Sequence, residues 1–265
     1  MSQLSSRDVV GDVLTRRISS AFDLTELEQS RIRKLATRYE RRAKGTLLAE
    51  QGDLGRGSRF LLSGWALRHA YLADGRRQIF GFVLPGDPLD PFGCLGPVTP
   101  EGILAVTSVD LVEMSRALTD DRMGSPHDLD RLELLMARQQ LGYIRNQIRR
   151  LGCQNACQRL AHFILEMHDR LSAIGLVDDG AFALPLTQEM LADALGLSVV
   201  HVSRMLKQLR EAGLADMSNG WTQVIRRGQL EALCEYDGIT DWRTPMGPAQ
   251  PARHSDMAEQ ACRRH

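Results

Sequence analysis

The sequence predicts an α+β protein with an N-terminal β-roll (jelly-roll-like) sensor domain, a long dimerisation helix and a C-terminal winged helix-turn-helix. Three observations predict this order. Residues 43–116 form short apolar runs separated by glycines, residues 126–151 repeat apolar side chains every seven positions, and residues 186–214 are typical of two short helices joined by a tight turn. The expected parts are a leader over 1–23, the β-roll over 24–124, the dimerisation helix over 125–153, the winged helix-turn-helix over 154–236 and a flexible tail over 237–265.

The composition excludes several classes of protein. The 265 residues carry 33 Lys+Arg and 33 Asp+Glu, so the formal net charge is zero and any attraction to nucleic acid must be local. No apolar run is long enough for a membrane span or a signal peptide, so we expect a cytoplasmic protein without a membrane partner. Five cysteines without framework spacing predict reduced thiols, and the role of Cys153 and Cys157 stays open.

The N-terminal forty residues predict one helix after an irregular start. Residues 1–20 have weak hydrophobic periodicity, which indicates a loosely ordered leader. From residue 24 to about residue 39, the apolar side chains of Leu27, Ile32 and Leu35 fall on one helical stripe. We therefore expect an amphipathic helix there.

The glycine-rich segment that follows predicts an antiparallel barrel. Residues 66–72 and 78–84 alternate in polarity and are joined through Asp74 and Gly75, which favour a hairpin turn. Such hairpins indicate a small β-barrel or jelly roll. Whether its interior holds a ligand or is filled by its own side chains stays open at this point.

A long helix is predicted over residues 126–151. Its apolar residues form two series with a spacing of seven, namely Leu134, Leu141 and Ile148, and Ala137, Ile144 and Leu151. This seam is typical of a two-stranded coiled coil, so we predict a homodimer with these six side chains at its interface. The alternative is a single helix packed against its own barrel.

A further helix is predicted from Asn155 to about Ala173, since asparagine is a favourable N-cap. Its residues His162, Glu166 and His168 raise the question of a metal site. His168 follows His162 by six residues and lies off its helical face, so we predict no bound metal.

Residues 186–214 predict a helix-turn-helix. Thr187 is placed to cap a first helix, Gly196 to end it with a positive φ, and Ser198 to cap a second helix. The second helix of such a pair normally enters the major groove, which predicts double-stranded DNA as a partner. The alternative is an ordinary amphipathic surface hairpin.

A β-hairpin is predicted directly after the two helices. Residues 214–217 and 221–225 alternate in polarity around Asn219 and Gly220, which favour a type I′ turn. Two helices followed by a hairpin form a winged helix. Asn219 at the tip is expected to lie near phosphate groups.

The order of these parts resembles the Crp/Fnr family of bacterial transcription regulators. The resemblance covers roughly residues 24–233 and is most specific in LPLTQEMLADALGLSVVHVSRMLKQLREAGL, LLAEQGD, GFVLPGD and LLSGWALRHAYLADGRRQI. It implies a non-enzymatic, DNA-binding transcription regulator with a cyclic-nucleotide-binding-like domain, acting as a homodimer on a palindromic site. It also implies RNA polymerase as a partner.

The resemblance also assigns roles in DNA recognition. Arg204 matches a base-contacting arginine of the family, and an arginine can donate two hydrogen bonds to guanine O6 and N7. Val200 stands where the cyclic-AMP receptor and the oxygen-sensing branch have a glutamate, so neither branch's operator is implied. The predicted DNA-binding residues are Thr187, Ser198, Val199, Val200, His201, Ser203, Arg204, Lys207, Arg210 and Asn219.

The usual effectors of the family lack their binding residues here. No arginine lies between Arg77 and Arg116, where the nucleotide-binding branch holds the cyclic phosphate, so we expect no cyclic nucleotide. The first cysteine is Cys94, so the N-terminal cluster that ligates an iron–sulfur centre is missing. We predict no cofactor, with haem through His69 or Cys94 kept as an open alternative.

Three functions remain at this stage. The first is a regulator whose β-roll receives an unidentified signal, and the second is an effector-independent regulator with a purely structural β-roll. A remote third is a cupin-like metalloenzyme, which needs several inward-facing ligands, whereas His69 is the only histidine of the β-roll segment. No catalytic residues are predicted, and the sequence leaves the operator and the direction of regulation open.

Overall fold

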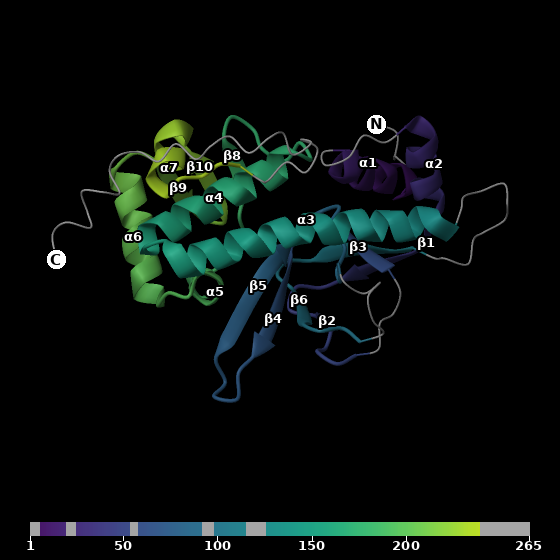
Figure 1. Ribbon diagram of the computed structural model, residues 1–265, viewed down its shortest axis with the longest axis horizontal. Helices are drawn as coiled ribbons and strands as arrows, with labels where there is room; N and C mark the ends of the chain where they lie inside the picture. Colours follow the sequence, from purple (N-terminus) through teal and green to yellow (C-terminus); the bar gives the residue numbers. More distant parts are fainter. Residues whose placement is uncertain (1–5, 20–24, 54–57, 92–97, 115–125, 239–265) are drawn as a thin grey trace, which may run out of the picture.

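The computed structural model describes residues 6–19, 25–53, 58–91, 98–114 and 126–238. A long helix, α3, runs through the molecule, with the strands β1–β7 packed along one part of it and a helical module at its far end (Figure 1). No helix of the described part is both long and apolar enough to cross a membrane. The elements, in chain order, are α1 (Ser6–Ser19), α2 (Glu26–Lys34), β1 (Ala36–Arg42), β2 (Leu47–Ala49), β3 (Ser58–Ser63), β4 (Ala66–Tyr71), β5 (Arg77–Val83), β6 (Gly102–Ala105), β7 (Val109–Met114), α3 (Pro126–Cys153), α4 (Ala156–Ser172), β8 (Ala181–Ala183), α5 (Gln188–Leu195), α6 (Val199–Glu211), β9 (Ala215–Ser218), β10 (Trp221–Val224) and α7 (Arg227–Cys234).

The N-terminal strands form a roll of two antiparallel sheets, ordered β1-β7-β3 and β2-β6-β4-β5. The predicted hairpin is confirmed, because β4 pairs with β5 in a register that places Leu67 opposite Phe82. Leu61, Val83 and Leu111 belong to one cluster of buried residues contributed by both sheets. Within the described residues, the roll is therefore filled at least in part by its own side chains.

Two predictions for the N-terminal residues are wrong. Part of the expected loose leader is helix α1, which buries Leu14 and Ile18 together with Arg17. A buried arginine interrupts the apolar stripe, which explains why the periodicity was weak. The helix expected up to residue 39 stops at Lys34, because the backbone around Tyr39 pairs with β7.

A buried ion network joins the roll to the helices around it. Asp87, in the turn after β5, accepts hydrogen bonds from Arg17 of α1 (2.8 Å) and Arg170 of α4 (2.6 Å). Glu166 of α4 likewise accepts a hydrogen bond from Arg150 of α3 (2.7 Å). Burial alone would raise the pKa of Asp87, but the two arginines hold it below its ordinary value. The roll, α1, α3 and α4 are thus connected through charges that are shielded from solvent.

The C-terminal module has the predicted local structure. Asn155 caps α4 by accepting hydrogen bonds from the backbone N–H groups of Cys157 and Gln158. Asn219 (φ 52°) and Gly220 (φ 77°) form the turn between β9 and β10. The short strand β8 adds a third member to this sheet, in the order β8-β10-β9, and was not expected. Residues 239–265 of the predicted tail lie outside the described residues, as do Cys94 and Cys262.

Candidate nucleic-acid interface

The two helices of the predicted helix-turn-helix are set by three local caps. The Thr187 hydroxyl accepts a hydrogen bond from the Met190 N–H (3.2 Å), and Gly196 ends α5 in the left-handed region at φ 62°. The Ser198 hydroxyl then accepts a hydrogen bond from the N–H of His201 (3.2 Å), which starts α6. Positive φ favours glycine, so this short turn fixes the angle between the helices.

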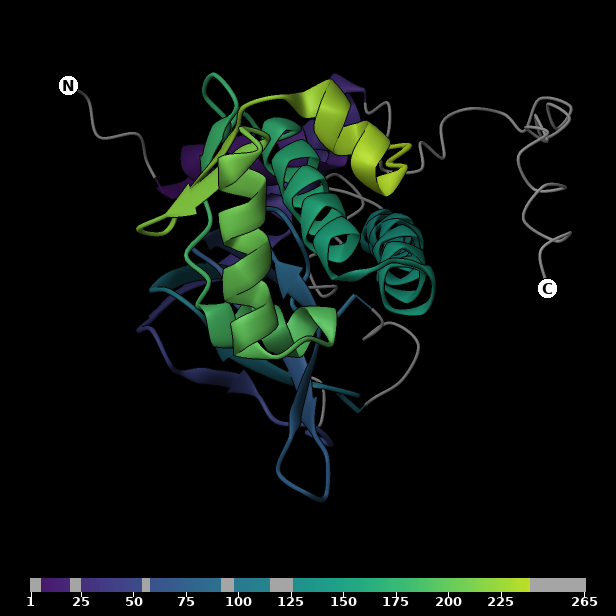
Figure 2. The ribbon, with the colours of Figure 1, turned by 90° about the vertical axis from the view of Figure 1, so that its left-hand side faces the viewer.

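Helix α6 occupies the end of the molecule opposite α1 and α2 (Figure 1). In the view onto that end it lies in front of the other elements (Figure 2). Its inner face buries Val202 and Leu209 in a cluster shared with α4 and α5. The amphipathic pattern therefore leaves one whole face of α6 open to solvent.

All ten predicted DNA-binding side chains are exposed. Eight of them come from the caps and the outer face of α6, Thr187 precedes α5, and Asn219 is at the tip of the β9–β10 wing. The structure thus places the predicted residues on the surface of one module, within the helix-turn-helix and its wing.

The cationic side chains of α6 differ in whether they form an ion pair or hydrogen bond with another residue of the chain. Arg204 has no hydrogen bond or ion pair with any residue that the structure describes. Arg210 is paired with Asp216 of the wing (2.6 Å), and Lys207 lies 3.7 Å from Glu211 one turn further along the helix. Arg204 is therefore free to bind a ligand outside the chain, whereas Arg210 already ties α6 to β9.

Sequence reasoning missed an aromatic side chain on the wing. Trp221 is exposed although it is large and apolar, and it follows directly after the Asn219-Gly220 turn. Its place at the start of a short strand, beside the predicted tip residue, was the available signal. The wing consequently offers an aromatic surface as well as an amide.

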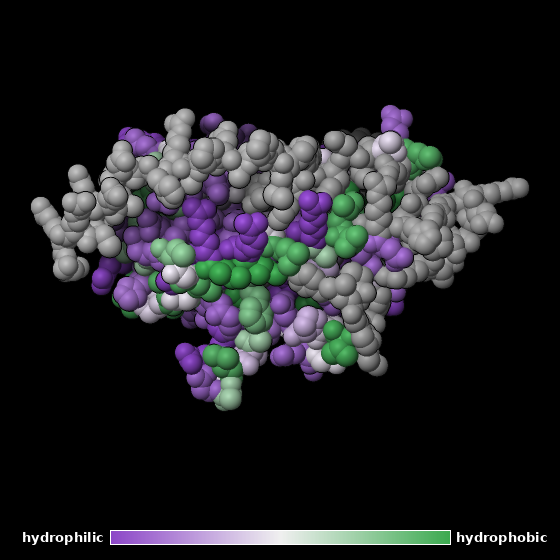
Figure 3. All heavy atoms as spheres, in the orientation of Figure 1, coloured by the Kyte–Doolittle hydropathy of each residue, from purple (hydrophilic) through white to green (hydrophobic). Residues whose placement is uncertain are grey.

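The predicted dimer seam is partly exposed in the single chain. Leu134, Leu141 and Ile148 are all at least half exposed, Ile144 and Leu151 are half-buried, and Ala137 is buried in its own chain. A continuous apolar stripe follows α3 on the surface (Figure 3). One side of α3 packs within its own chain, through Met136 and Ala137, while the exposed side chains of the seam form an apolar surface that is available to a second copy.

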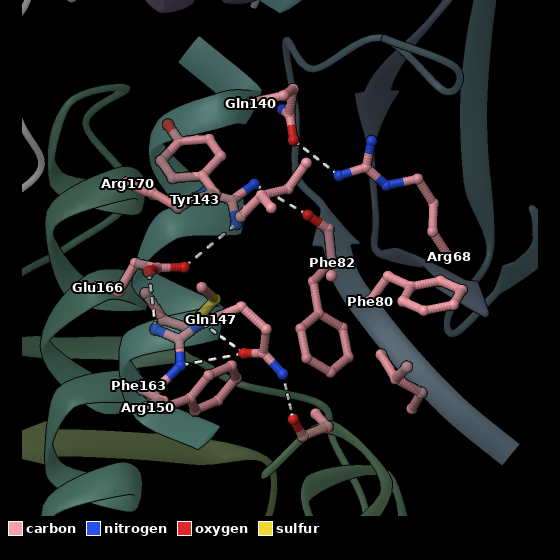
Figure 4. A pocket seen from close by; sticks show the side chains of 15 residues that line it. Arg68, Phe80, Phe82, Gln140, Tyr143, Gln147, Arg150, Phe163, Glu166 and Arg170 are labelled. Atoms are coloured by element: carbon pink, nitrogen blue, oxygen red, sulfur yellow. Dashed lines mark hydrogen bonds and ion pairs between the residues drawn. The ribbon is translucent and has the colours of Figure 1, made fainter. Parts of the chain in front are cut away.

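A small pocket lies between β4–β5, α3 and α4 (Figure 4). Its volume is about 20 Å³, which is room for one water molecule. Arg68 donates a hydrogen bond across its rim to Gln140 (2.7 Å) and lies 3.7 Å from Glu101. This pocket is too small for a nucleotide, and the three arginines that line it, Arg68, Arg150 and Arg170, all bond to other residues of the chain.

Of the other candidate ligating residues, His162 and Glu166 contact neighbouring side chains, whereas both ring nitrogens of His69 lack a hydrogen-bond partner among the described residues. His162 is buried, and its Nδ1 lies 3.1 Å from the amide nitrogen of Gln154, while Glu166 is held by Arg150. Burial and the neighbouring Arg150 lower the pKa of His162 to about 4, so it is neutral near pH 7. His69 is also buried, and its ring packs edge-on against Tyr71. Cys153 and Cys157 are free thiols, the first exposed and the second half-buried.

Comparisons with known proteins match both halves of the chain. The sequence model of the Crp-like helix-turn-helix domain matches residues 158–236, and that of the cyclic nucleotide-binding domain matches residues 39–123. The nitrogen fixation regulation protein FixK of Bradyrhizobium diazoefficiens is 29% identical over 223 residues, which is 83% of this chain and 91% of that protein. The fumarate and nitrate reduction regulatory protein of Vibrio cholerae is 24% identical over 212 residues, covering 80% and 84% of the two chains.

Solved structures agree with these matches. The structure of FixK2 from Bradyrhizobium japonicum aligns with a TM-score of 0.64 at 27% identity, covering 75% of this chain and 96% of that one. The transcriptional regulator TTHB099 of Thermus thermophilus, with a TM-score of 0.59 and 22% identity, covers 76% and 98% and supports the fold alone. None of these matches supports a cupin-like metalloenzyme.

Proposed function

The chain belongs to the Crp/Fnr family of DNA-binding transcription regulators, and from this premise we propose that it binds a palindromic DNA site as a homodimer. The exposed face of α6, with Arg204 free of internal partners, is the observation that supports the proposal most strongly. The chain's relatives are transcription regulators, and we assign it no catalytic role.

Base contacts are assigned to the outer face of α6. Arg204 donates to guanine, His201 and Ser203 contact neighbouring base edges, and Val199 and Val200 lie against thymine methyl groups. Valine at position 200 cannot accept a hydrogen bond from cytosine, as a glutamate would. The base preferred there should therefore differ from that of family members with a glutamate.

Phosphate contacts are assigned to the polar residues around this face. Thr187 and Ser198 stand at the N-terminal ends of α5 and α6, where backbone N–H groups and the helix dipole favour an anion. Lys207 and Asn219 add contacts on α6 and the wing. Arg210 contributes indirectly by holding the wing through Asp216.

Dimerisation is assigned to the apolar stripe of α3. Each apolar side chain buried between two α3 helices stabilises the dimer by about 1.5–3 kcal/mol before entropic costs. A twofold axis along this helix would present two copies of α6 to half-sites about one helical turn apart. RNA polymerase is proposed as a further partner on the basis of the family alone.

Replacing Leu141 by Glu should convert the dimer to monomers. The variant puts two charges into the seam, and we expect the dimer dissociation constant to rise about 10²-fold or more. Sedimentation equilibrium measures this constant. Leu176→Glu is a matched control, because Leu176 and Leu141 are both 51% exposed but Leu176 lies outside α3. Equal dissociation of both variants, or a Leu141→Glu protein that stays dimeric, would contradict the assigned interface.

The signal received by the roll remains a separate question from DNA binding. The internal pairing of Arg68, together with the lack of any arginine between Arg77 and Arg116 in the sequence, supports a regulator that does not use a cyclic nucleotide. Either an unidentified signal acts elsewhere on the roll, or the roll is structural and protein abundance sets activity. Specific DNA binding by the purified protein without added ligand would favour the second.

A further inference from the structure

We propose that the β-roll positions the helix-turn-helix directly, through a clasp between β5 and the C-terminal end of α5. The clasp comprises Arg77, Gln78, Gln147 and Asp193 together with the last carbonyl groups of α5. It rests on the proposed function in one respect only: the helix that it positions, α6, is taken to be the DNA-reading helix.

The centre of the clasp is an ion pair between residues 116 positions apart in the chain. Arg77 of β5 places Nη2 2.7 Å and Nε 2.8 Å from Oδ2 of Asp193 in α5. The neighbouring Gln78 donates a hydrogen bond from its side-chain amide to the backbone carbonyl of Asp193 (3.0 Å). Two consecutive residues of the roll therefore hold one residue of the helix-turn-helix.

The end of α5 is held from three other elements. A helix leaves its last four carbonyl groups without helical partners. The Ala192 carbonyl accepts from the turn after the helix, and those of Asp193, Ala194 and Leu195 accept from side chains. The donors are Gln78 of β5, Gln147 of α3 and Arg159 of α4, respectively.

The clasp is also connected to the buried ion network. The Gln147 side chain accepts hydrogen bonds from Arg150 (2.7 and 3.0 Å), and Arg150 is paired with Glu166 (Figure 4). Gln147 is thus fixed in place before it donates to the Ala194 carbonyl. At least one of the side chains that hold α5 is therefore positioned by the buried network.

This contact determines where α6 points. Only Gly196, Leu197 and Ser198 separate α5 from α6, and Leu195 and Val202 pack in one cluster. Holding the final turn of α5 therefore holds the start of α6 as well. Since Leu67, Ile79 and Phe82 of the roll belong to the same cluster, a shift of the β4–β5 hairpin would reach the reading helix through α5 and through the residues of α4 in that cluster.

The effect of this ion pair can be separated from that of a neighbouring positive charge. Arg77 is 19% exposed and Asp193 30% exposed, so the pair lies in a partly desolvated contact between the roll and α5. The adjacent Arg76 is 77% exposed and pairs with Asp74 within the same hairpin turn. Arg76 thus has the same charge and almost the same position, but its ion pair with Asp74 stays within the hairpin.

The test compares Arg77→Glu with Arg76→Glu in the full-length protein. Hydrogen exchange in residues 188–195, measured without DNA, should accelerate in Arg77→Glu and stay unchanged in Arg76→Glu. Binding to an operator of optimal half-site spacing should weaken about fivefold or more in Arg77→Glu only, and discrimination against a site with one extra base pair between its half-sites should fall. The exchanged pair Arg77→Asp with Asp193→Arg should restore both properties.

Two results would overturn the clasp, and a third would overturn only the proposed function. Equal losses in Arg76→Glu and Arg77→Glu would show that the lost positive charge acts on DNA directly, and would overturn the clasp. Failure of the exchanged pair to restore exchange protection would overturn it too. If the unaltered protein binds no specific DNA, the proposed function fails, but the exchange comparison still decides whether the roll holds α5.

Discussion

Replacing Asp87 by Ala is expected to lower the free energy of unfolding by about 3–5 kcal/mol, since it leaves two buried arginines without their carboxylate. Arg17 and Arg170 are each almost fully buried, and both bond to Asp87 at 2.6–2.8 Å. Asp87 also accepts the backbone N–H of Leu84 (2.9 Å), so the turn after β5 loses its internal bond as well. Urea denaturation measures the change.

Asp87→Ala should destabilise the protein more than the loss of a carboxylate from an ion pair on the surface. Asp110 lies 3.8 Å from Arg41 on the surface and accepts a hydrogen bond from the Ser63 hydroxyl (2.6 Å), so Asp110→Ala should cost about 1–2 kcal/mol. If the free energy of unfolding fell by a similar amount in both variants, burial would not explain the strength of the ion pairs of Asp87. Asp87→Asn is a useful third variant, because it retains a hydrogen-bond acceptor but removes the charge.

The second large effect is expected on sequence recognition. Arg204→Ala should remove roughly 1–3 kcal/mol of base discrimination per half-site, and hence roughly 2–6 kcal/mol for a dimer on two half-sites. Binding should become similar for the native operator and for operators altered at the guanine that Arg204 contacts. Competition titrations against such duplexes measure the discrimination.

Lys207→Ala is the matched control on the same helix. Its side chain is exposed like that of Arg204, but we assign it to phosphate, so its loss should weaken binding to all sequences alike. It should also make the dependence of affinity on salt less steep, by about one unit of log–log slope for each lysine. An Arg204→Ala protein that discriminates as the unaltered one does would remove Arg204 from the base contacts.

The features that sequence predicted best depend on few, neighbouring residues. Thr187 and Ser198 each accept a hydrogen bond from a backbone N–H three residues later, and Gly196 ends α5 through its own backbone angle, so each signal for the helix-turn-helix is local. Asn155 and the Asn219-Gly220 turn work in the same way. Such local chemistry can be recognised without knowing what the rest of the chain does.

The features that sequence missed depend on distant partners. Arg17 can be buried in α1 because Asp87, 70 residues away, lies beside it and accepts its hydrogen bond. Residues 36–42 form a strand because β7 is available for pairing, although their neighbours favour helix. The pairing of Arg77 with Asp193 and of Arg210 with Asp216 likewise follows from the fold and not from any local pattern.

If two copies of the chain read two copies of one DNA sequence through α6, the DNA sites that the protein prefers must show it. The most direct measurement is selection of bound duplexes from a random DNA pool by the purified full-length protein. We expect an enriched palindrome with half-site centres about one helical turn apart and a guanine required in each half, which Arg204→Ala no longer requires. Enrichment of a single unrepeated sequence, or no enrichment over the starting pool, would contradict it.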